Sequence, residues 1–133
     1  MPQKPLLDEV SDVLSSQEDI VVGIAFGSLA AGRAGPHSDI DIAVLGRLAP
    51  LGSRRKAELI RDLAAVTGRP VDLIDLRTAG VAVRRAAIRG GRRLVCKDRR
   101  AYDALVSKMM TDAEDFLPYR ERMLRERLRA WTR

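Results

Sequence analysis

Cysteine and histidine are almost missing from this 133-residue chain, which has one of each, Cys96 and His37. A single cysteine excludes an intramolecular disulfide, and the two residues together cannot provide the ligands of a usual Cys/His zinc site. Aromatic residues are also scarce, at 4%. A core must therefore be built from Val, Leu, Ile and Ala.

Long hydrophobic runs are missing as well. No stretch approaches the roughly 18 apolar residues needed to span a bilayer, and acidic residues interrupt the N-terminus where a signal peptide would be apolar. We therefore expect a cytoplasmic protein with no membrane partner.

The composition is that of a globular protein, with 46% hydrophobic and 32% charged residues, and the length suits one domain over 1–133. The formal charge of +6 is uneven, because residues 77–100 contain nine Arg or Lys and one acid, Asp98. Such a segment attracts polyanions, but it is equally typical of a solvated, arginine-rich surface. Nucleotide, nucleic acid and an acidic protein face all stay open as partners.

Hydrophobic periodicity predicts alternating helices and strands. Helices are expected over 5–17, 54–67, 79–91 and from 99 onward, and strands over 20–26, 39–45, 71–76 and 92–96. Pro118 should end or kink the last helix, leaving a separate C-terminal helix over 116–133. Its apolar residues Leu117, Leu124, Leu128 and Trp131 form one stripe, which fits packing on the domain's own core or an interface.

Two acidic residues stand two positions apart on the strand predicted over 39–45. Their side chains, Asp39 and Asp41, therefore emerge on one face, while Ile40 and Ile42 enter the core. Two adjacent carboxylates raise each other's pKa unless a cation lies between them, and Mg²⁺ or Mn²⁺ prefers such oxygen ligands. The pattern predicts a metal site.

A third acid, Asp72, begins the strand predicted over 71–76. If this strand pairs with the one over 39–45, Asp72 joins the other two carboxylates, and Asp75 points to the opposite face. Three carboxylates can hold two ions, the arrangement that serves nucleotidyl transfer.

Gly27 and Ser28 follow the strand over 20–26 and precede residues 29–31, Leu-Ala-Ala, which could begin a short helix whose N–H groups face a phosphate. Glycine allows close backbone approach, and serine adds a hydroxyl. Alone, the pair is a weak signal. Followed by ten residues, 29–38, and then by Asp-Ile-Asp, it combines a phosphate cradle with metal ligands.

The stretch FGSLAAGRAGPHSDIDIAVL, with VDLIDL after one helix, resembles the minimal nucleotidyltransferases, single-domain members of the DNA polymerase β-like superfamily. The resemblance implies an α/β (α+β) fold with a mixed sheet of about four strands flanked by helices. It also implies the roles of individual residues. Those expected to bind the nucleotide are Gly27, Ser28 and Ser38, and those expected to be catalytic and to bind metal are Asp39, Asp41 and Asp72.

In its spacing the motif is closest to the MntA-type antitoxins of HEPN/MNT toxin–antitoxin pairs. This resemblance implies transfer of AMP from ATP, with two Mg²⁺ ions or Mn²⁺, to a tyrosine of a bound HEPN RNase toxin. A transferase acting on RNA or on a small molecule such as an aminoglycoside is a second hypothesis, and an antitoxin acting by binding alone is a third. For His37 we assign no role, Cys96 and Tyr102 are expected to pack, and no residue stands out as a general base.

Overall fold

Helices and strands follow one another in the order that the sequence predicts. The computed structural model describes residues 4–28, 30, 32, 35 and 38–111. Its elements are α1 (Leu6–Ser15), β1 (Ile20–Phe26), β2 (Ile40–Gly46), α2 (Ser53–Thr67), β3 (Val71–Asp75), α3 (Val81–Gly90), β4 (Arg92–Cys96) and α4 (Arg99–Met110). The predicted order is confirmed through α4. Pro118, the apolar stripe and the predicted helix over 116–133 lie outside the described residues.

The four strands form one mixed sheet in the order β3-β2-β1-β4. Strands β2 and β3 run parallel and are joined by α2, whereas β1 is antiparallel to both β2 and β4. A parallel pair needs a crossover connection of this kind, because the chain must return to the same end of the sheet. The expectation of a mixed sheet with about four strands is confirmed.

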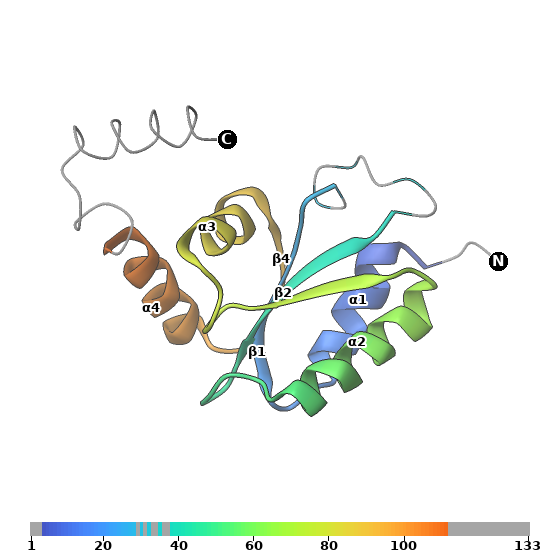
Figure 1. Ribbon diagram of the computed structural model, residues 1–133, viewed down its shortest axis with the longest axis horizontal. Coiled ribbons are helices and arrows are strands. Elements are labelled where there is room, and N and C mark those ends of the chain that lie inside the picture. The colour runs from blue at the N-terminus through green and yellow to red at the C-terminus, as the bar shows by residue number, and fades with distance from the viewer. Residues whose placement is uncertain (1–3, 29, 31, 33–34, 36–37, 112–133) are drawn as a thin grey trace.

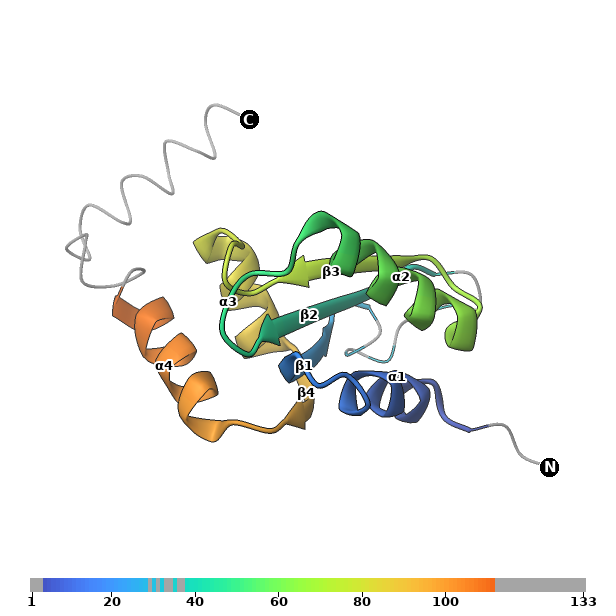
Figure 2. The ribbon, with the colours of Figure 1, turned by 90° about the horizontal axis from the view of Figure 1, so that it is seen from below.

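The sheet separates two helical layers, with α1 and α2 on one face and α3 and α4 on the other (Figures 1 and 2). A first buried cluster joins α1 and α2 to the sheet through Val10, Leu14, Ile20, Ala25, Ile40, Ile42, Val44, Leu59, Leu63, Leu73 and Val95. A second, on the α3 and α4 face, comprises Val21, Val22, Ile24, Ala43, Leu45, Leu76, Ala87 and Leu105. The described part of the chain has no helix long and apolar enough to cross a membrane.

Burial on both faces explains why β1 is an unbroken apolar run. Six of its seven residues are buried, and only Phe26 at its end is partly exposed. In β2 the partly exposed residue is Asp41, and the other six are buried. A single polar side chain near the start of a central, buried strand marks the place where the sheet meets solvent.

Two helix ends differ in how well the sequence places them. Gly68 ends α2 as predicted, since it has φ +68° and its N–H donates to Ala64 O at 2.8 Å. The first helix was predicted over 5–17 but ends earlier, at Ser15. The N–H of Ser16 still donates to Asp12 O at 3.2 Å, so Ser16 caps the helix and Gln17 already belongs to the turn into β1.

Candidate active site

The two inner carboxylates of the predicted site lie on neighbouring strands. In the parallel pairing of β2 with β3, Asp41 is directly opposite Asp72. The predicted adjacency of these strands is therefore confirmed, and residues opposite each other in a sheet place their side chains on the same face. The sheet brings the two acids together, although 30 residues separate them in the sequence.

Alternation along the strands identifies the face on which they stand. Ile40 and Ile42 belong to the cluster on the α1 and α2 side, whereas Ala43 belongs to the cluster under α3 and α4. Since side chains alternate along a strand, Asp41 lies on the α3 and α4 face. Asp72 lies on the same face, because Asp41 is its partner in the register.

Asp39 stands just outside β2, which begins at Ile40. The prediction that placed it within the strand is wrong by one residue. The reason is local: the N–H of Ile40 donates to Pro70 O at 3.0 Å, so the pairing with β3 starts there. Asp39 is exposed, but its charge still affects Asp41.

The electrostatics of Asp41 show that the three acids interact. Desolvation by burial raises the pKa of Asp41 above its ordinary value of 3.8, and the negative charges of Asp72 and Asp39 and a hydrogen bond with Asp72 raise it further. No cationic side chain counters these effects among the causes of the shift. The site therefore has an excess of negative charge that a bound cation would neutralise.

Gly27 follows β1 beside this group. Its predecessor, Phe26, pairs with Asp41 in the sheet. Gly27 has φ +69°, and a Cβ atom at this position would fall on Oδ2 of Asp41. Only glycine combines this backbone conformation with so close an approach. The structure thus joins two parts of the predicted motif, the Gly-Ser turn and the second aspartate.

The short helix expected after the Gly-Ser pair is not seen in the described residues of this segment. Gly27, Ser28, Ala30 and Gly32 are turn residues, and Leu29 and Ala31 lie outside the described set. Two positive-φ glycines within six residues, Gly27 and Gly32, explain the turn, because this conformation interrupts a right-handed helix. Ser28 itself is partly exposed.

Ser38, which precedes the first aspartate, has a hydrogen-bonding role of its own. Its Oγ accepts a hydrogen bond from the N–H of Gly35 at 2.8 Å, and its N–H donates to Gly35 O at 3.2 Å. Arg69 donates from Nη1 to the same carbonyl at 2.6 Å. Sequence reasoning missed Arg69, because a side chain that reaches 34 residues back along the chain leaves no local pattern.

Asp75 is set apart from the site, as predicted. It is paired with Val44 in the register, which places it on the face opposite Asp72. It is 6% exposed and accepts hydrogen bonds from the N–H groups of Leu51 at 2.8 Å and Arg77 at 2.9 Å. Asp75 therefore fixes the loop between β2 and α2.

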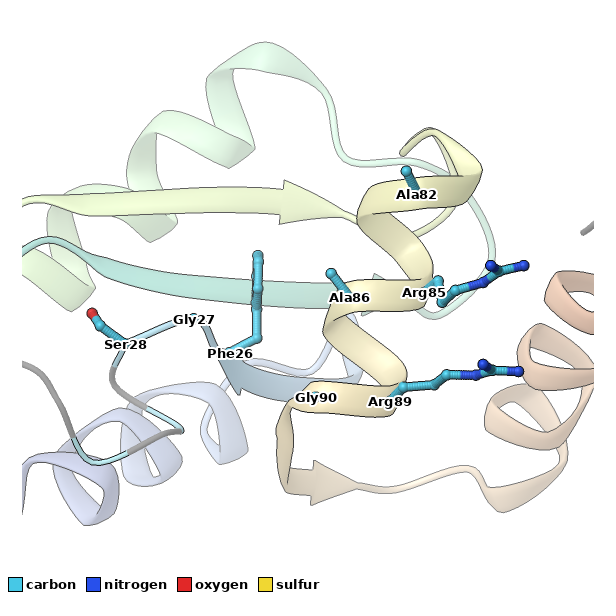
Figure 3. A pocket seen from close by; sticks show the side chains of 8 residues that line it. All are labelled: Phe26, Gly27, Ser28, Ala82, Arg85, Ala86, Arg89 and Gly90. Atoms are coloured by element: carbon cyan, nitrogen blue, oxygen red, sulfur yellow. The ribbon is translucent and has the colours of Figure 1, made fainter. Parts of the chain in front are cut away.

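A cleft of about 700 Å³ opens between the end of β1 and α3. Its described lining residues are Phe26, Gly27, Ser28, Ala82, Arg85, Ala86, Arg89 and Gly90, and none of them is acidic. Figure 3 shows Phe26 between the Gly-Ser turn and the helix. The sequence indicates Arg85 and Arg89 only as part of the basic segment 77–100, because helical arginines usually face solvent.

The donor set of Asp39, Asp41 and Asp72 fits Mg²⁺ in chemistry and in charge, since these are hard oxygen ligands and the raised pKa of Asp41 indicates uncompensated negative charge. Across the described residues, no group of three or more histidine, cysteine, aspartate or glutamate side chains is placed so as to hold one metal ion. Metal binding by these residues therefore stays a prediction.

The remaining predicted residues do not belong to this group. Cys96 and Tyr102 pack against the second buried cluster, as expected, and the guanidinium of Arg93 lies 4.7 Å from the centre of the Tyr102 ring. His37 lies outside the described residues.

Comparison with known proteins decides the family. Residues 8–100 match the family model described as Polymerase beta, Nucleotidyltransferase. The chain belongs to this family. A search of curated proteins finds no match to this nucleotidyltransferase.

Solved structures share its fold. A toxin–antitoxin crystal structure with AMP-PNP contains a chain that matches with a TM-score of 0.75 and 24% identity over 92% of this nucleotidyltransferase and 98% of that chain. A structure of a tri-AMPylated Shewanella oneidensis HEPN toxin with its MNT antitoxin gives a TM-score of 0.70 and 22% identity, over 92% and 96%. A structure described as a proposed minimal nucleotidyltransferase matches with a TM-score of 0.57 and 27% identity, over 65% of this chain and 90% of that chain.

Proposed function

We propose that this nucleotidyltransferase is an antitoxin that transfers AMP from ATP to a tyrosine of a cognate HEPN toxin and thereby neutralises it. The observation that carries the chemistry is the register of β2 with β3, which sets Asp41 opposite Asp72 beside the Gly27 turn. The likeness in fold supports a HEPN toxin as the acceptor, because similar chains occur in a toxin–antitoxin complex with AMP-PNP and in one with an AMPylated HEPN toxin.

The described residues suggest a division of roles. The Gly27–Ser28 turn receives the triphosphate, with glycine allowing the backbone to approach and Ser28 offering its hydroxyl as a donor. Asp39, Asp41 and Asp72 would hold two Mg²⁺ ions, and these ions would supply charge neutralisation for the attacking oxygen and for the pyrophosphate. Ser38 and Arg69 keep the end of the loop before Asp39 in place through Gly35.

In the reaction, the hydroxyl oxygen of the acceptor tyrosine forms a bond to the α-phosphorus of ATP. The bond from that phosphorus to the bridging oxygen of the β-phosphate breaks, and the proton of the hydroxyl goes to a base or to solvent. The products are tyrosyl-AMP and pyrophosphate.

The decisive experiment incubates the protein with labelled ATP and Mg²⁺ in three parallel reactions, with a HEPN partner, with total RNA and with an aminoglycoside. Label on a tyrosine of the HEPN partner is the expected result. Label on RNA or on the aminoglycoside instead would show that the acceptor is not a HEPN toxin, although the protein still transfers a nucleotide.

A paired variant separates catalysis from binding. Asp39→Asn with Asp41→Asn removes two of the three charges without changing side-chain size, so the protein should still fold and bind the toxin but should no longer label it. A double variant that neutralises the toxin as well as the wild type would mean an antitoxin that acts by binding alone.

A further inference from the structure

The cleft beside the Gly-Ser turn contains two arginines that the proposed reaction does not yet use. Arg85 and Arg89 lie one turn apart on α3, and the small residues Ala82, Ala86 and Gly90 complete that wall. No acid occurs among the described residues of the lining. The described residues that line the cleft therefore include two positively charged side chains and no negatively charged one.

The cleft and the carboxylates share one face and one end of the sheet. Phe26, in the lining of the cleft, is paired with Asp41. On the other side of β1, Ala25 is paired with Arg92, which begins β4 directly after α3. The last turn of α3 thus lies close to the end of β1, where Gly27 and Ser28 follow.

The two neighbouring arginines of α3 differ in how their polar atoms are satisfied. Arg84 is buried, and it donates from Nε to Leu76 O and from Nη2 to Ala79 O, both at 3.2 Å. Arg85 has a buried Nε with no hydrogen-bond partner in the structure. A buried donor left unsatisfied costs free energy, and a native structure that contains one calls for an explanation. Arg84 therefore has a structural role, because it donates to two backbone carbonyls. The Nε of Arg85 has no such acceptor.

Figure 3 shows how the Arg85 side chain lies. It extends from α3 on the same side as Arg89, towards α4 and away from Ser28. Its guanidinium therefore stands at the rim of the cleft. Rotation about the bonds of its own side chain would take Nε out of its unsatisfied position and swing the guanidinium towards the Gly-Ser turn, past the small side chains of Ala82 and Ala86.

We propose that Arg85 binds the β- or γ-phosphate of the nucleotide and changes its rotamer when the nucleotide binds. This inference rests on the proposed function, because the nucleotide site at Gly27 and Ser28 is part of it. The guanidinium group suits this role, since its planar donors match phosphate oxygens in pairs. A phosphate would also satisfy the donor that is now without a partner.

The test measures binding of ATP, AMP and inorganic tripolyphosphate by calorimetry, with Mg²⁺ and without any acceptor. Arg85→Met removes the charge but keeps an apolar stem of similar length, and Arg61→Met, on an exposed position of α2 in the opposite layer, is the matched control. Arg85→Met should weaken ATP and tripolyphosphate by about 10- to 100-fold and leave AMP within about twofold. Arg85→Lys, which keeps the charge, should recover part of the loss. Thermal melting of each variant checks that it is folded.

The outcomes separate this inference from the function on which it rests. If the wild type binds ATP and Arg85→Met binds it equally well, the role of Arg85 is wrong and the proposed function stands. Equal losses for ATP and AMP also overturn the assignment to the β- and γ-phosphates. A wild type that does not bind ATP would overturn both proposals.

Discussion

The two faces of the sheet are made by the same strands and yet are built differently. On the α1 and α2 face, β2 contributes three fully buried apolar side chains, Ile40, Ile42 and Val44. On the α3 and α4 face it contributes Ala43 and Leu45. Near the start of β2, the side chain on this face is that of Asp41, which is charged. The first face is closed along the whole strand, and the second is open where the acids stand.

The difference teaches how one strand can serve both stability and chemistry. Because side chains alternate, a strand can keep one face for the core and place a charged group on the other without breaking the ladder of hydrogen bonds. The two aspartates of β3 illustrate this. Asp72 is exposed and lies opposite Asp41, whereas Asp75 is buried and satisfied by two backbone N–H groups.

The largest expected effect comes from changing these two aspartates in the same way. Asp72→Ala should reduce AMP transfer more than about 100-fold, because it removes one of the three carboxylates proposed to bind metal, and should leave the free energy of unfolding unchanged or slightly higher. Asp75→Ala should lower the free energy of unfolding by about 1–3 kcal/mol, because it leaves the N–H groups of Leu51 and Arg77 without their acceptor. Transfer assays and urea denaturation measure the two effects.

The pair of results decides whether the two faces are distinct. If Asp72→Ala destabilises the fold as much as Asp75→Ala does, then Asp72 is a structural residue. If it leaves transfer intact, the third carboxylate of the site is another residue.

The next effect concerns packing on the two faces. Ile42→Ala should lower the free energy of unfolding by about 2–5 kcal/mol, since Ile42 is fully buried on the closed face. Phe26→Ala should cost less than half of that, although the side chain is larger, because its ring is partly exposed in the cleft. Val66→Ala, at an exposed position of α2, is the control and should change stability by less than about 0.5 kcal/mol. Equal losses for Ile42 and Phe26 would mean that the second face is closed too.

A smaller effect is expected where the Gly-Ser turn meets Asp41. Gly27→Ala should be more destabilising than Gly68→Ala, although both glycines have nearly the same φ, +69° and +68°. At Gly68 a Cβ meets nothing within 4 Å, so the cost there is that of the backbone conformation alone, about 1–2 kcal/mol. At Gly27 the Cβ also meets the carboxylate of Asp41, which should add about 1 kcal/mol or more. Urea denaturation of both variants measures the difference.

A double variant tests the source of that added cost. Asp41→Ala removes the carboxylate that the new Cβ would meet, so Gly27→Ala in this background should cost about as much as Gly68→Ala. An undiminished cost would show that the contact with Asp41 does not cause the strain.

Much of the fold could be predicted, and four residues of the candidate site could be proposed, because their signals are local. The alternation at the start of β2 and the unbroken apolar run of β1 identify strands, and Gly68 followed by Pro70 ends a helix. The spacing between Gly27-Ser28 and the two aspartates depends only on sequence. Each of these patterns arises from neighbours along the chain, so the sequence contains the whole signal.

The features that could not be predicted depend on long-range contacts or on fine geometry. The hydrogen bond from the N–H of Ile40 to Pro70 O decides where β2 begins and leaves Asp39 outside it. Arg69, between α2 and β3, reaches Gly35 in the loop between β1 and β2. Arg85 differs from its neighbour Arg84 in burial and in how its donors are satisfied. A basic stretch of sequence does not reveal which of its arginines has a partner.

The smallest expected effect is on the pH dependence of stability. The pKa of Asp41 in the folded protein lies above its ordinary value of 3.8, so ionisation of Asp41 opposes folding. This penalty is absent below pH 3.8, grows as the pH rises through the folded pKa and is complete above it. Asp41→Asn removes the penalty and should therefore raise Tm at pH 7 without metal, and the gain should disappear below about pH 4.

Two controls connect this shift to the site. Asp62→Asn, at an exposed position of α2 on the other side of the sheet, should show no comparable gain. Mg²⁺ should stabilise the wild type more than Asp41→Asn, because a ligand that binds the folded state more tightly stabilises it more. Melting curves between pH 3 and pH 8, with and without Mg²⁺, measure both effects. A gain for Asp41→Asn that stays the same across this range would show that the pKa of Asp41 is not raised in the folded protein, and the electrostatic argument for a cation at the open face would then be lost.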